Sequence, residues 1–168
     1  MGGVAKGIAI GMVVVAAGAC SGSSSRGLPQ EPEPPSKVSA TLILSSTSVQ
    51  TGKRISGRIE IVNDTGKAIH IAGCGGLFQV LLTSPSYHPQ PAWTDCLQLF
   101  TIPTGHYSER VTVQATYNSC GHERPTASVP RCTTDGIPAL PPGEYAATVF
   151  ERTNVIPRAA AIPVLVTR

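Results

Sequence analysis

The feature that most constrains this chain is the spacing of its apolar residues beyond residue 37, which has a period of two. Such alternation is typical of β-strands with one buried face. The clearest case runs from Arg54 to Ile61, where apolar residues or glycine alternate with Arg, Ser and Glu. No long helical period occurs in this part, and 15 prolines and 17 glycines interrupt the whole chain. The sequence therefore predicts an all-β fold.

About seven or eight short strands are expected after residue 37. The nearly continuous apolar run at residues 77–82 predicts a strand covered on both faces. Short strands separated by frequent turns are typical of an antiparallel β-sandwich. The strand candidates are residues 38–44, 55–61, 69–71, 77–82, 97–102, 111–117, 145–149 and 162–166.

The stretch LPPGEY, Leu140 to Tyr145, delivers a tyrosine to the start of an expected strand directly after a Pro-Gly turn. It resembles the tyrosine corner of Greek-key sandwiches, in which the hydroxyl hydrogen-bonds to nearby backbone. With the strand pattern over residues 38–168, it resembles a bacterial immunoglobulin-like (Ig-like) domain. The cysteines and Trp93 do not have the spacing of antibody domains. The resemblance implies an Ig-like antiparallel β-sandwich and no particular activity.

The first 20 residues have the parts of an export signal, namely one lysine, an apolar run from Ile8 to Val15, and small residues before Cys20. The run is too short to span a bilayer as a helix. Its end, AGAC, resembles the lipobox of bacterial lipoproteins, although Ala17 stands where leucine is usual. The resemblance implies that residues 1–19 are a lipoprotein signal peptide and that Cys20 carries fatty acyl chains such as palmitate. Ordinary cleavage after Ala19, which would release a soluble secreted protein, is the alternative.

Residues 20–37 then connect this anchor to the domain at 38–168. After the cysteine they read SGSSSRGLPQEPEPPSK, in which Leu28 is the one large apolar residue. Such a composition cannot bury enough surface to offset its conformational entropy, so we expect a flexible tether. Two acyl chains suffice for stable anchoring. The expected location is the extracytoplasmic face of the cell membrane.

Four further cysteines lie within the expected domain. An even number in an exported chain predicts disulfides, although sequence alone does not choose among the three pairings that four cysteines allow. We favour Cys74 with Cys96 and Cys120 with Cys132, because each pair would brace an irregular connection rich in Gly or Pro. A zinc site is disfavoured, because no two cysteines have the close Cys-x₂₋₄-Cys spacing.

No recognisable catalytic motif is present. The sequence contains no Gly-x-Ser-x-Gly, Ser-x-x-Lys or His-Glu-x-x-His, and its two Thr-Gly-Lys triplets, at 51–53 and 65–67, lack the glycine spacing of a phosphate loop. The net charge is only +3, and the basic residues do not cluster with aromatic ones, which disfavours nucleic acid as a partner. We therefore expect a protein that is not an enzyme and that has no cofactor.

The long connections at residues 84–93 and 119–138 are the expected places for a binding site, because long loops on a rigid sandwich often carry function. Candidate residues for a binding loop are Tyr87, His88, Trp93 and Tyr107, whose rings would supply amphipathic contact area. Core packing is the alternative for Trp93.

The sequence thus predicts a monomeric, lipid-anchored envelope protein that binds an envelope protein or glycan, or that has a structural role. A metal-binding envelope protein using the histidines between residues 88 and 122 is the alternative. A secreted hydrolase or inhibitor has less support.

Overall fold

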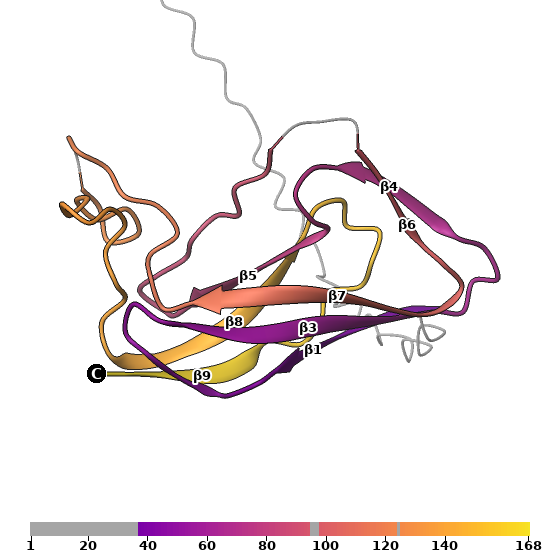
Figure 1. Cartoon of the computed structure of the whole chain (residues 1–168), viewed down its shortest axis with the longest axis horizontal. Helices are drawn as coiled ribbons and strands as arrows, with labels where there is room; N and C mark the ends of the chain where they lie inside the picture. The colour runs from indigo at the N-terminus through magenta and orange to yellow at the C-terminus, as the bar shows by residue number, and fades with distance from the viewer. Residues whose placement is uncertain (1–36, 95–97, 124) are drawn as a thin grey trace, which may run out of the picture. The chain divides into compact units, whose positions relative to one another are not determined.

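The computed structural model describes residues 37–94, 98–123 and 125–168. In these ranges the chain is all-β, as predicted, with nine strands in three sheets (Figure 1). The strand orders are β1-β3-β7, β2-β9-β8-β5 and β4-β6. The strands are β1 (Val38–Leu44), β2 (Ser48–Gln50), β3 (Arg54–Asn63), β4 (Ile69–Gly73), β5 (Phe78–Thr83), β6 (Gln98–Ile102), β7 (Gly105–Gln114), β8 (Gly143–Glu151) and β9 (Ile162–Thr167).

The strand that the sequence analysis missed is β2, so the expected number of seven or eight was wrong. β2 has three residues, of which only Val49 is buried, and this is too short for a periodic pattern. It also departs from the antiparallel rule, because it pairs parallel to β9 with Ser48 opposite Leu165. All other strand pairs of the described residues are antiparallel. The chain therefore passes from the first sheet to the second between β1 and β2.

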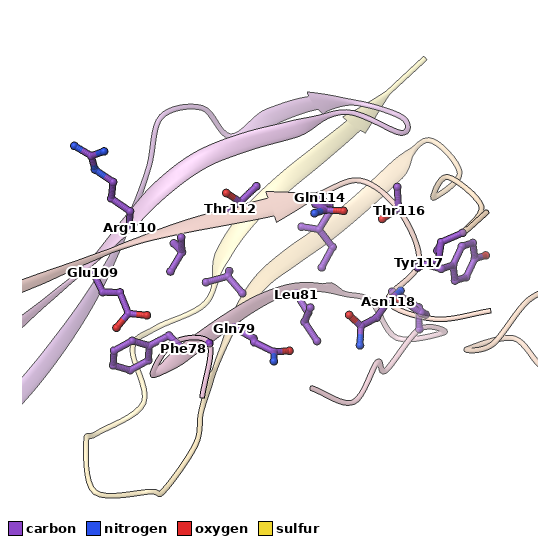
Figure 2. Close-up of a pocket in the computed structure, with 16 residues that line it drawn as sticks. Phe78, Gln79, Leu81, Glu109, Arg110, Thr112, Gln114, Thr116, Tyr117 and Asn118 are labelled. Carbon is purple, nitrogen blue, oxygen red and sulfur yellow. Dashed lines mark hydrogen bonds between the residues drawn. The ribbon is translucent and has the colours of Figure 1, made fainter. Parts of the chain in front are cut away.

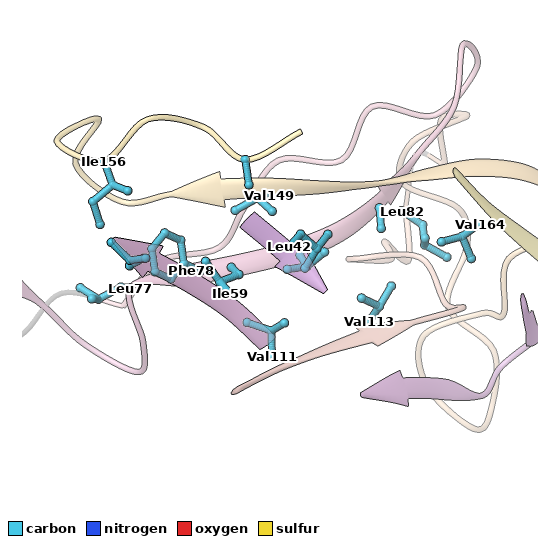
Figure 3. Packing of buried hydrophobic residues seen from close by; sticks show 14 of the residues in the cluster. Leu42, Ile59, Leu77, Phe78, Leu82, Val111, Val113, Val149, Ile156 and Val164 are labelled. Atoms are coloured by element: carbon cyan, nitrogen blue, oxygen red, sulfur yellow. The ribbon is translucent and has the colours of Figure 1, made fainter. Parts of the chain in front are cut away.

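The two larger sheets pack around one shared hydrophobic core (Figure 3). Ile59, Ile61 and Val113 contribute from the first sheet and are fully buried. From the second sheet, every other residue of β5, namely Phe78, Val80 and Leu82, is buried, while the residues between them are only half-buried. The prediction that residues 77–82 are covered on both faces was therefore wrong, because a cleft borders the half-buried positions.

The paired strands β3 and β7 continue as β4 and β6 after a break. Asn63 stands opposite Gly105 and Ile69 opposite Ile102, so residues 64–68 face residues 103–104. Asn63 is fully buried at this joint. Its Nδ2 donates to the carbonyls of Lys67 (2.9 Å) and Pro103 (3.1 Å), and its Oδ1 accepts from the backbone N–H of Thr65 (3.2 Å) and from its hydroxyl (2.7 Å). The side-chain amide of Asn63 thus supplies hydrogen bonds where the backbone hydrogen bonds between the paired strands are interrupted.

The tyrosine corner is present at the start of β8. The Tyr145 hydroxyl donates to the Pro141 carbonyl over 3.0 Å, as the LPPGEY stretch predicts. Burial raises the pKa of this phenol. The contact holds the entry of β8 against the turn before it.

The disulfide Cys120–Cys132 also forms as predicted, with the two Cα atoms 5.0 Å apart. It closes a loop that extends beyond the ends of β7 and β8 (Figure 1). Cys74 is disulfide-bonded as well. Its expected partner Cys96 lies outside the described residues, and so do Cys20, the signal segment and most of the tether.

Within the described part of the chain, the structure contains no helix long and apolar enough to cross a membrane.

Candidate functional site

A cleft of about 300 Å³ lies between β5 and β7 (Figure 2). β5 is the last strand of the second sheet, and β7 is the last strand of the first. The two strands pack against each other but belong to different sheets, so neither has a further strand partner on this side among the described residues. The cleft therefore runs between two open sheet edges.

The lining of this cleft combines apolar surface with hydrogen-bonding groups. Leu81 on β5 and the exposed Ile137 supply apolar area. Hydroxyl and amide side chains come from the end of β7 and the segment after it. Ligand pockets usually have a mostly apolar wall with a few convergent polar groups; this cleft is more polar than that, and its 300 Å³ is at the small end of their range. The hydroxyl and amide side chains are those of Thr112, Gln114, Thr116 and Asn118, and Gln79 on β5 and the charged Glu109 and Arg110 line the cleft as well.

Glu109 lies at one end of the cleft, with its carboxylate directed toward Phe78 (Figure 2). Its Oε1 accepts the backbone N–H of Leu77 over 3.1 Å, while its Oε2 is buried and has no partner among the described residues. Burial raises the pKa of this carboxyl, and the nearby backbone N–H groups of Leu77 and Phe78 oppose that rise. A side chain at Gly76 would approach Oε1 to 3.1 Å, so the chain must pass close to the carboxylate here. Glu109 thus connects β7 to the chain that enters β5.

The sequence analysis did not single out Glu109 as a site residue. A signal was present, because Glu109 occupies a core-facing position in the alternation that continues through Val111 and Val113. An acidic residue at such a position needs a hydrogen-bonding partner in the interior.

Tyr87 forms the opposite end of the cleft. Its side chain is only 5% exposed, and its hydroxyl accepts the backbone N–H of Asn118 over 2.7 Å. The ring packs edge-on against Tyr117 with centroids 5.0 Å apart. Burial raises the pKa of the Tyr87 phenol. Of the four residues expected in a binding loop, Tyr87 is the one that lines the cleft, and it does so as a buried wall.

The other three candidate residues lie apart from this wall. His88 is exposed, with Nε2 3.1 Å from the Pro85 carbonyl oxygen. Trp93 is half-buried, and the guanidinium of Arg152 lies 5.2 Å from the centre of its ring. Tyr107 is not in a loop but on β7, opposite Ile61. The structure therefore does not assemble the four aromatic and imidazole side chains into one surface.

The histidines that the metal-binding alternative requires are dispersed. His70 contacts the hydroxyl of Thr101 over 3.1 Å, and His88, His106 and His122 are exposed. Among residues 37–94, 98–123 and 125–168, no three His, Cys, Asp or Glu side chains come close enough to hold a metal ion. The described geometry thus supplies no argument for that alternative.

Comparison with known proteins adds no assignment. No protein-family model matches this sequence, and a search of curated proteins finds no match either.

Proposed function

We propose that this chain is a lipid-anchored protein of the bacterial cell envelope, whose Ig-like domain is a non-catalytic binding module. The Ig-like assignment is supported by two features together. One is the stacking of the sheets β1-β3-β7 and β2-β9-β8-β5 around one core, and the other is the tyrosine corner on the penultimate strand β8. The lipid anchor is supported by the AGAC stretch that ends at Cys20.

The observation that carries the binding role is the cleft between β5 and β7. Sheet edges in natural proteins are usually blunted or covered, because unpaired backbone groups there attract other chains. Here two edges face a cavity with both apolar and hydrogen-bonding side chains. A cleft of this kind between two sheet edges is suited to hold a small ligand.

Site-specific crosslinking in intact cells tests this role. A photoreactive diazirine amino acid is placed at Leu81 in the cleft or, as a matched control, at Leu165, which is 47% exposed on β9 and does not line the cleft. We expect adducts at position 81 to exceed those at 165 several-fold. Peptide mass spectrometry detects them whatever the chemical class of the ligand. Equal adduct yields at the two positions would show that the cleft is not the binding site.

The anchor is tested separately by cell fractionation. Cys20→Ala removes the thiol to which acyl chains attach, so we expect the protein to leave the membrane fraction or to accumulate as an uncleaved precursor. Ser21→Ala is the matched control, because it changes the neighbouring residue and keeps the thiol. Incorporation of labelled palmitate into the Cys20→Ala variant would contradict the assignment.

A further inference from the structure

The solvent face of the first sheet presents its side chains in rows that cross all three strands. One row is Ile43–Arg58–Arg110, and it follows from the strand register. The next row consists of hydroxyls, Ser45, Ser56 and Thr112, all of them exposed. Beyond it Arg54 stands opposite Gln114.

The pairing of Arg58 with Arg110 is unfavourable for folding. The two residues are direct register partners on neighbouring antiparallel strands, where like charges destabilise the sheet. Arg58 Nε donates to Glu60 over 2.7 Å, which compensates part of one charge. Arg110 has no ion pair among the described residues, and its guanidinium points away from Glu109 (Figure 2). An anion placed between the two guanidinium groups would turn this repulsion into attraction.

A shallow hollow of about 420 Å³ lies at this pair. Both arginines line it, together with Ser45 and Ser56 of the hydroxyl row, and Ile43, Leu44 and Gly57 form the rest of its wall. Guanidinium groups bind carboxylates bidentately, and hydroxyls both donate and accept hydrogen bonds. The hollow therefore offers anion-binding and sugar-hydroxyl-binding groups side by side.

We propose that this face binds an acidic polysaccharide, with a carboxylate of the glycan held between Arg58 and Arg110. On strands β3 and β7 the face carries three arginines, Arg54 included, against the single Glu60. It lacks the aromatic side chains on which nucleic-acid bases stack.

A membrane surface fits this face less well, because the apolar side chains at the hollow, Ile43 and Leu44, are half-buried and the exposed side chains around them are polar or charged. The large apolar side chains that are exposed in the described part of the chain belong to other segments, namely Leu99, Ile137, Val155 and Leu165. Arg110 and Thr112 also line the β5–β7 cleft, so the two sites share part of β7. Arg58 lines only the hollow and Leu81 lines only the cleft, so tests at these two positions distinguish the two assignments.

Binding is measured by isothermal titration with the purified full chain in neutral detergent. The probes are polygalacturonate, the uncharged glycan dextran, and polyphosphate, which is anionic but carries no sugar. We expect polygalacturonate to bind most tightly of the three, and we expect its affinity to fall with added salt. Arg58→Gln and Arg110→Gln should each lower the affinity for polygalacturonate about tenfold, as expected for loss of one charge-assisted contact. Arg158→Gln, at an exposed loop arginine, is the matched control and should leave it unchanged.

Thermal unfolding provides the second readout. Arg110→Gln removes the repulsion between the paired arginines and breaks no ion pair, so its melting temperature should stay the same or rise while its affinity falls. Arg58→Gln also loses the ion pair with Glu60, so Arg110→Gln is the variant for this comparison. A variant that is at least as stable but binds more weakly would support the proposal that the paired arginines serve binding rather than folding. Unchanged affinity of Arg58→Gln and Arg110→Gln relative to Arg158→Gln would overturn the proposal. So would tighter, equally arginine-dependent binding of polyphosphate.

Discussion

The Asn63→Ala variant should lose about 2–4 kcal/mol of unfolding free energy, because it deletes a fully buried amide that makes four hydrogen bonds at this joint. The carbonyls of Lys67 and Pro103 lose the Nδ2 donor, and the N–H of Thr65 loses its acceptor. These groups lie where the β3–β7 pairing gives way to β4–β6, so no ladder hydrogen bond replaces them. Chemical denaturation followed by circular dichroism gives the free energy directly.

Asp64→Ala is the control for this prediction. Asp64 is the next residue in the same turn and is exposed, so its substitution should change stability by no more than about 0.5 kcal/mol. If Asn63→Ala also fell within that range, the joint would not depend on the buried amide. Hydrogen exchange would show where the loss is felt, because we expect faster exchange in β4 and β6 than in β3.

The joint at Asn63 shows which features of the fold can be predicted from the alternation of apolar and polar residues, and which cannot. The pattern from Arg54 to Ile61 located β3, because a period of two follows from one buried face. The burial of Asn63 depends on the Pro103 carbonyl, which is 40 positions away in the chain, and no local pattern reports such a contact.

The cleft escaped prediction for a related reason. It exists because β5 and β7 are the edges of two different sheets, and this follows from strand order rather than from any one strand's residues. The sequence analysis singled out the long connection after β5 as a candidate binding site, and it named Tyr87 there. It expected the ring to be presented to a partner, whereas the structure buries it.

Tyr87→Ala should therefore reduce the unfolding free energy by about 3–5 kcal/mol, the usual cost of deleting a buried aromatic side chain. The substitution removes the edge-on contact with Tyr117 and the acceptor for the Asn118 N–H. Tyr87→Phe keeps the ring and loses only that acceptor, so it should cost about 1 kcal/mol. Denaturant titration of both variants separates the packing of the ring from its hydrogen bond.

His88→Ala completes the series, because His88 is the exposed neighbour that the same sequence pattern proposed for a binding surface. If Tyr87 has a structural role, the free energy of unfolding of Tyr87→Ala must be lower than that of Tyr87→Phe. His88→Ala should stay within about 0.5 kcal/mol of the unmodified chain. If Tyr87→Ala were as stable as His88→Ala, the Tyr87 ring would not stabilise the domain. Its role would then lie in contact with a binding partner. Tyr87 and Asn118 form the wall at one end of the cleft. Of the two Tyr87 variants, Tyr87→Phe keeps the shape of that wall. Ligand crosslinking at Leu81 should therefore persist in Tyr87→Phe.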